Sequence, residues 1–341
     1  MYNIFKKHRR WKLICAILSL SLLTVMAGAA VAPALGLIQA YFADTDRSLV
    51  QMIVSMPALF IAGTNLFLFK PLCKRFRART LLIFGLLLYT VFGCLAGLFS
   101  NILMILVCRA LVGIGVGIIM PLSTGLLSFY FTRDKQGPLM GYSSALNMLG
   151  GVVATLIAGG LAMISWRLSF MVYLLGLISI VLCIIWMPND RIYESSRKAQ
   201  SAGSSGQYAP YILVMFVLSF TFFVYPANFA LECSSSGAIP QGLIAPVMAM
   251  MDVFGTLAGS AFVGLANGIG VPYIMTSASA KAGRDAATTV MPLISASLYL
   301  AQFATPLILS ATGHFTDVSS FIIAVFAALL LAAASFTIKE Q

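Results

Sequence analysis

The stretch that decides the fold runs from Ile102 to Ser128 and reads ILMILVCRALVGIGVGIIMPLSTGLLS. Arg109 is its only charged residue. A membrane-crossing helix needs about 20 mostly apolar residues, and this run exceeds that length. A charged side chain inside such a helix is costly unless it finds a partner or water. The stretch therefore predicts a membrane-spanning helix and marks Arg109 as a functional candidate.

The whole chain has the composition of a protein that lipid covers. Of its 341 residues, 60% are hydrophobic and 9% are charged, against roughly 45–50% and about 25% in soluble domains. No soluble fold can bury this much apolar surface, so we expect an all-α polytopic membrane protein. With the run around Arg109, the apolar runs predict ten spans: 13–41, 50–69, 80–100, 102–128, 139–164, 168–187, 209–231, 242–280, 287–311 and 318–338.

The N-terminus allows two interpretations. Basic residues precede the first apolar run, and the small residues Ala27, Gly28 and Ala29 follow, which fits a cleaved signal peptide. However, the apolar run continues to Tyr41 and further spans follow. This favours an uncleaved first span.

Basic residues gather on alternate sides of the predicted spans. They cluster before the first span, between the second and third, and in the later loops on the same side. The opposite side holds only Arg47 and Arg167. By the positive-inside rule both termini are cytoplasmic, which requires an even number of crossings. The net charge of +11 is explained by these loops, and we expect membrane lipids rather than nucleic acid as its partner.

A polar stretch divides the chain. We predict a six-helix bundle over 1–187, a cytoplasmic linker over 188–208 and a shortened helical bundle over 209–341. The two parts share a repeat, because Gly113–Met120 (GIGVGIIM) matches Gly268–Met275 (GIGVPYIM) after 155 residues. Parallel repeats of six-helix halves are a property of one large transporter fold.

These motifs resemble the major facilitator superfamily, in particular its bacterial drug and metabolite efflux branch. The resemblance is carried by Arg75 and Arg79 in the loop 70–79, by Arg109-x-x-x-Gly113-x-Gly115, by Gly151 with Gly159-Gly160, and by Trp166-Arg167 with Phe170. It implies two helical bundles and secondary transport. The loop departs from the family pattern, because Lys74 stands where the family has an acid. In the family that acid pairs with arginine and gates the inward side.

The spacing of the repeat predicts about ten spans instead of the family's twelve. Gly63 pairs with Gly255 at an offset of 192, whereas the later repeat has an offset of 155. The difference of about 37 residues approaches one helix plus a loop, at about 20 residues per span. Our hypothesis is an internal deletion, in which a stub of the eighth helix (242–256) is fused to the tenth (257–280).

Several residues are candidates for transport because intramembrane polar groups need partners or water. The resemblance places Arg109 near a proton-coupling path; its alternative role is to anchor helices through backbone carbonyls. Asp252 is a candidate carrier of a proton or cation. Candidates for lining a cavity are Gln39, Asn65, Asn147, Tyr225, Asn228 and Gln302. Lys74, Arg75 and Arg79 form the candidate gating loop, and the candidate helix-packing glycines are Gly113, Gly117, Gly151, Gly159 and Gly160.

The sequence contains no nucleotide-binding or catalytic motif, and its six cysteines show no metal spacing. We therefore expect no enzymatic activity, no cofactor and no metal. The favoured function is proton-coupled efflux of a small amphipathic solute by alternating access, by a monomer in the bacterial inner membrane. The alternatives are a degenerate membrane protein that does not transport and a proton-coupled uptake carrier.

Overall fold

The computed structural model describes residues 2–131, 133–189, 208–237, 240–254, 270–271, 273–274 and 293–311. Every regular element within these ranges is helical. The labelled α-helices are α1 (Tyr2–Ala29), α2 (Leu35–Tyr41), α3 (Arg47–Gly63), α4 (Phe69–Arg75), α5 (Ala78–Leu95), α6 (Ile102–Tyr130), α7 (Arg133–Ala162), α8 (Gly176–Trp186), α9 (Ala209–Ser236) and α10 (Gln241–Phe254). Four further helical segments extend them. Three are 3-10 helices, namely η1 (Ala32–Ala34), η3 (Ala96–Leu98) and η4 (Leu168–Leu175), and η2 (Thr64–Leu68) is a π-helix.

Seven helical segments of the described chain are long and apolar enough to cross a membrane. They are Trp11–Tyr41, Arg47–Leu68, Ala78–Leu98, Ile102–Leu127, Gly141–Ala162, Leu168–Trp186 and Leu293–Ala311. Each overlaps a predicted span, so the predicted all-α polytopic fold is confirmed. The span 318–338 and most of the proposed fused helix over 242–280 lie outside the described residues.

Two helices differ from their predicted spans for identifiable reasons. The first span is broken after Ala29, where the η1 turn contains Pro33; proline has no N–H to continue the helix. α9 continues to Ser236, beyond the predicted end at 231. Gly237 ends it with a positive φ of 64°, and its N–H donates to the carbonyl of Cys233. Hydropathy marks where the apolar stretch ends, whereas the left-handed glycine marks where the helix ends.

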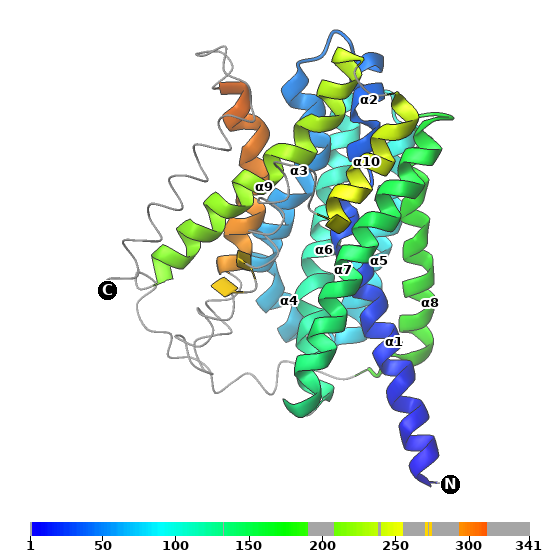
Figure 1. The fold of residues 1–341 in the computed structure, drawn as a ribbon. Coiled ribbons are helices and arrows are strands. Elements are labelled where there is room, and N and C mark those ends of the chain that lie inside the picture. The colour runs from blue at the N-terminus through cyan, green and yellow to red at the C-terminus, as the bar shows by residue number, and fades with distance from the viewer. Residues whose placement is uncertain are drawn as a thin grey trace.

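The first half, α1 to α8, forms a bundle of roughly parallel helices (Figure 1). α6 packs against α3 and α5, and α1 packs against α7. The core of this bundle is aliphatic, and its outer surface carries large exposed apolar side chains such as Val107 and Ile185. Such a surface suits lipid.

Arginine residues mark the two ends of the bundle. At one end, the Arg167 guanidinium donates to the carbonyls of Gly97 and Phe99 and to the hydroxyls of Tyr41 and Ser100. We call this the Arg167 end. At the other, the Arg79 end, Nη2 of Arg79 donates to a backbone carbonyl in the last turn of α8.

The second half, which comprises α9, α10 and 293–311 among the described segments, contacts the first half. α10 packs along α7, and α9 contacts α2, η1 and α3. All of these α9 contacts lie toward the Arg167 end. Figure 1 shows the same arrangement: α9 crosses at an angle, with its last turns beside α2 and its first turns away from the bundle.

Candidate functional site

Arg109 lies fully buried at the centre of the first half, with 0% of its surface exposed. Its Nε donates to the carbonyl of Ile53 on α3 at 2.7 Å. Nη1 donates to the hydroxyl of Tyr173, and Nη2 donates to the carbonyl of Ala27 on α1. The Tyr173 hydroxyl also donates to Ala27, at 2.9 Å. One guanidinium therefore joins α1, α3, α6 and η4.

The backbone explains why these two carbonyls are available. The carbonyl of Ile53 would normally accept from the N–H four residues later, but that residue is Pro57, which has none. Ala27 lies in the last turn of α1, where carbonyls have no intrahelical donor. The end of a helix also carries partial negative charge, which favours a cation. Arg109 thus donates to two carbonyls that have no donor within their own helix. One lacks its donor because of a proline, and the other because its helix ends.

The acceptors of Arg109 are all neutral. Its hydrogen bonds go to two backbone carbonyls and a phenol, and its Cζ lies 5.5 Å from the centre of the Tyr173 ring. No acid of the described chain forms an ion pair with it. Asp252 lies on α10, but its side chain is outside the described residues.

A buried hydrogen bond joins the two halves near the Arg167 end. Nε2 of Gln51 on α3 donates to Oδ1 of Asn228 on α9 at 2.9 Å, and both side chains are buried. Nδ2 of Asn228 donates to the carbonyl of Val224 in its own helix at 2.8 Å. The Asn228 amide is therefore held in one orientation with its oxygen toward the first half.

Other contacts between the halves involve the helix that contains residues 293–311. The Tyr299 hydroxyl donates to Sδ of Met120 on α6 at 2.9 Å. Nε2 of Gln302 lies 3.1 Å from the position that a Cβ on Gly28 would occupy. The Gln302 amide therefore lies close against α1 at Gly28.

The remaining cavity candidates take different positions. Gln39 donates to the carbonyl of Thr45 at 3.2 Å, and Asn147 accepts from Thr24 at 2.6 Å; both bonds lie within the first half. Asn65 lies in the π-helical η2, and its buried Oδ1 has no hydrogen-bond partner among the described residues. Tyr225 is on α9, with its side chain outside the described part. The described side chains among the six candidates therefore do not gather into one site.

Three of the candidate glycines lie where helices approach closely. A Cβ on Gly113 would collide with the carbonyl oxygen of Pro57, and one on Gly117 would lie 2.7 Å from Cβ of Thr64. A Cβ on Gly159 would collide with Cβ of Ala245 on α10, across the contact between the halves. Gly160 differs, because no described atom lies within 4 Å of its Cβ position. Gly151 is buried.

The candidate gating loop forms the end of α4 and the start of α5. Lys74 and Arg75 lie exposed in the last turn of α4, where basic residues suit the negative helix end. Arg79 instead reaches α8, as described above. Because Lys74 stands where the family has an acid, this position lacks the carboxylate that would pair with an arginine.

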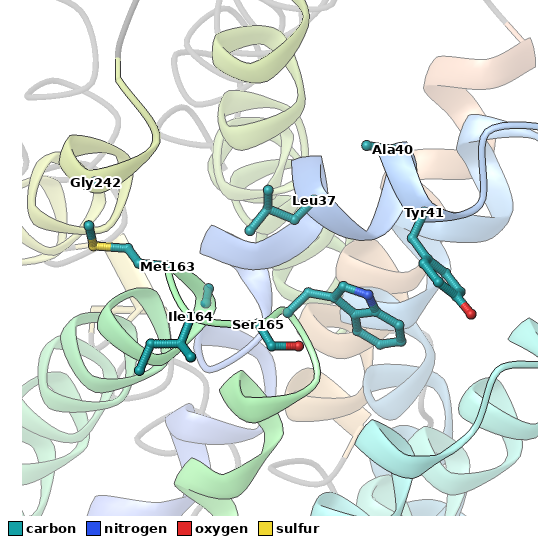
Figure 2. A pocket seen from close by; sticks show the side chains of 9 residues that line it. Leu37, Ala40, Tyr41, Met163, Ile164, Ser165 and Gly242 are labelled. Atoms are coloured by element: carbon teal, nitrogen blue, oxygen red, sulfur yellow. The ribbon is translucent and has the colours of Figure 1, made fainter.

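A shallow pocket lies at the Arg167 end (Figure 2). Its volume is about 600 Å³, and it is lined by Leu37, Ala40, Tyr41, Ala162, Met163, Ile164, Ser165, Trp166 and Gly242. Figure 2 shows Leu37 and Tyr41 on one side and Met163 and Gly242 on the other. Gly242 belongs to α10, so both halves form this pocket.

Comparison with known families decides the identity of the fold. The family model described as Major Facilitator Superfamily matches residues 15–239. The chain belongs to the Major Facilitator Superfamily. The predicted family is confirmed, and the superfamily consists of membrane transport proteins rather than enzymes.

Individual transporters are similar to the chain at low identity. An uncharacterized transporter of Schizosaccharomyces pombe is 26% identical over 206 residues, which cover 59% of this chain and 42% of that protein. The multidrug efflux pump SdrM of Staphylococcus aureus is 26% identical over 151 residues, which cover 43% of this chain and 34% of the pump. The chain thus spans less than half the length of these two relatives.

A solved structure supports the same fold. A POT family transporter in complex with a thioalcohol-conjugated peptide aligns with a TM-score of 0.68 at 11% identity, and the alignment covers 96% of each chain. At this identity the likeness concerns the fold alone.

Three residues of the site were not predicted from the sequence: Gln51, Pro57 and Tyr173. Pro57 could have been identified from the sequence, because a proline inside a predicted span leaves the carbonyl four residues earlier without a donor. Gln51 lies at the start of its span, where a polar residue is ordinary. Tyr173 has no signal beyond its position in an apolar run.

Proposed function

We propose that this superfamily member is a secondary transporter that exports a small amphipathic organic solute by alternating access, driven by a proton gradient. Alternating access in such folds is a rocking of one helical bundle against another around a site between them. The observation that carries the proposal is the buried hydrogen bond between Gln51 and Asn228, because it joins the two halves near the Arg167 end.

The distribution of basic residues indicates which end of the bundle faces the cytoplasm. Exposed basic residues such as Arg75 and Arg77 lie toward the Arg79 end, which the positive-inside rule assigns to the cytoplasm. We therefore propose that both termini are cytoplasmic and that the membrane is the bacterial plasma membrane. The contacts at the Arg167 end then close the outward side.

The substrate class rests on the relatives and on the chemistry of the contact. SdrM is described as a multidrug efflux pump, which supports the export of small organic solutes. The described side chains between the halves include amides, a phenol and a thioether, at Gln51, Asn228, Gln302, Tyr299 and Met120. In the proposal Arg109 supports the coupling site and Asp252 carries the proton.

The direct test is solute flux in vesicles containing the purified chain. We expect an imposed pH gradient to drive uptake of a fluorescent cationic amphiphile into inside-out vesicles, and we expect a protonophore to abolish it. The absence of gradient-dependent flux for a panel of such dyes would favour the alternative of a membrane protein that does not transport. Flux in the opposite direction would favour an uptake carrier.

Replacement of Gln51 by leucine is expected to open the Arg167 end more often. Without its donor, the Asn228 oxygen stays unpaired in the closed arrangement, which costs about 1 kcal/mol or roughly a fivefold population shift. The buried thiol of Cys233 near the end of α9 reports this opening. In a chain that retains only Cys233, maleimide labelling should accelerate about fivefold.

The buried Cys183 on α8 provides the control for that measurement. In a chain that retains only Cys183, Gln51→Leu should leave the labelling rate unchanged. Equal acceleration at both thiols would mean general loosening of the bundle and would contradict a specific closing contact.

Gly159→Val should reduce flux while its neighbour Gly160→Val should not. A side chain at 159 collides with Ala245 on α10 and keeps the halves apart, whereas position 160 faces open space in the described chain. We expect about a tenfold loss of gradient-driven flux for Gly159→Val, because overpacking a close contact typically costs about 1–3 kcal/mol. Similar flux from both variants would show that the close approach of α7 and α10 is unnecessary.

A further inference from the structure

The pocket at the Arg167 end combines apolar surface with two aromatic rings, those of Tyr41 and Trp166, that Arg167 contacts. Leu37, Ala162 and Met163 contribute apolar surface, and the exposed fractions of Met163 and Ile164 are 64% and 76%. The volume of about 600 Å³ lies within the range of roughly 300–1,000 Å³ of small-molecule sites. The volume of the pocket is therefore large enough for part of a hydrocarbon chain.

Aromatic residues place this pocket at the level of the membrane surface. Tyr41 and Trp166 both line it, and their ring centres lie 5.2 Å apart. Tyrosine and tryptophan concentrate where the hydrocarbon meets the headgroups. The Trp166 side chain donates no hydrogen bond within the described residues, so its indole N–H remains available to a polar group of a ligand.

Arg167 supplies a positive charge beside these rings. Its Cζ lies 4.6 Å from the centre of the Trp166 ring and 5.3 Å from that of Tyr41. Its hydrogen bonds go to neutral carbonyls and hydroxyls, so they do not neutralise the charge. No acid of the described chain pairs with it, including Asp44 and Asp46 in the nearby loop.

We propose that this pocket binds one acyl chain of an anionic phospholipid, with the lipid phosphate beside Arg167 and Trp166. Both halves form the pocket, since Gly242 lies in the first turn of α10 while the other lining residues belong to the first half. A bound lipid therefore bridges the halves. The proposal does not depend on transport, because binding is measured without a transported solute.

The test uses Trp166 as its own reporter. The chain has three tryptophans, so Trp11→Phe and Trp186→Phe leave Trp166 alone. In nanodiscs, phosphatidylglycerol with dibrominated acyl chains should quench Trp166 at about one fifth of the mole fraction that phosphatidylcholine with the same chains requires. One basic residue near an anionic surface contributes about 1 kcal/mol, or about fivefold.

Two variants separate the headgroup from the chain. Arg167→Gln should remove the preference for phosphatidylglycerol, whereas Arg167→Lys should keep it. Ala40→Phe fills the pocket and should reduce quenching by both lipids severalfold. The matched control is Ala43→Phe, which changes an exposed residue outside the pocket lining and should have no effect.

Two results would overturn the proposal. Equal quenching of the parent chain by the two lipids would exclude a phosphate site at Arg167. Unchanged quenching in Ala40→Phe would mean that Trp166 senses only the bulk bilayer, with no chain in the pocket.

Discussion

Arg109→Met is expected to lower the free energy of unfolding in detergent by about 2–4 kcal/mol. Methionine fills much of the space of arginine but donates no hydrogen bond. The carbonyl of Ile53 would then stay buried without the donor that the guanidinium now supplies, and that of Ala27 would keep only the Tyr173 hydroxyl. Unfolding by increasing amounts of a denaturing detergent, followed by circular dichroism, measures the loss.

A second substitution tests the reason for this loss. Pro57→Ala restores an N–H four residues after Ile53, so the helix can satisfy that carbonyl by itself. In the Arg109→Met background we expect Pro57→Ala to recover about 1 kcal/mol, the usual net contribution of one hydrogen bond. In the parent chain Pro57→Ala should change the free energy of unfolding little, because Arg109 already donates to the carbonyl of Ile53.

Pro121→Ala is the matched control for removal of a proline. Pro121 lies inside α6, and the carbonyl that it leaves open is not one that Arg109 binds. Its effect should therefore be the same with Arg109 or with methionine at position 109. Equal rescue by both proline substitutions would show that straighter helices, rather than the Ile53 carbonyl, explain the recovery.

The course of the chain through the membrane was largely predictable. Lengths of apolar sequence report directly on the hydrocarbon thickness, so the spans containing Arg109 and Trp186 were predicted to within a few residues. The break at Pro33 and the extension of α9 to Gly237 were not predicted. Both depend on backbone hydrogen bonding, which hydropathy does not describe.

The partners of the polar residues were much less predictable. The sequence identified Arg109 and Asn228 as unusual, because a buried polar group must be satisfied. It did not identify Gln51 or the carbonyl of Ala27 as their partners. Those pairings depend on how whole helices lie against one another, and residues 177 positions apart, such as Gln51 and Asn228, have no local signal in common.

The same limit applies to the glycines. Small residues at regular spacing indicate that helices can approach, but they do not say which glycine faces a neighbour. Gly159 and Gly160 are adjacent in sequence, yet only Gly159 meets another helix in the described chain. One residue of helix turns the chain by about 100°, so adjacent positions face different surroundings.

Gly113→Ala is expected to destabilise the chain by about 2 kcal/mol, whereas Gly125→Ala should leave it unchanged or slightly more stable. Both glycines lie on α6. An added Cβ at 113 would collide with the Pro57 carbonyl and lie 2.9 Å from Cβ of Phe60, but at 125 no described atom lies within 4 Å. The same detergent titration measures both variants, and equal effects would contradict the close contact of α3 with α6.

The position of this contact leads to a sharper expectation. Gly113 lies one turn from Arg109 on α6, and it faces the proline that frees the carbonyl of Ile53. A methyl group at 113 should push α3 outward and lengthen the hydrogen bond from Arg109 to Ile53. Gly113→Ala should therefore cost less in the Arg109→Met background, by about 1 kcal/mol, because part of what it disrupts is already lost. Strict additivity would mean that the helix contact and the arginine act separately.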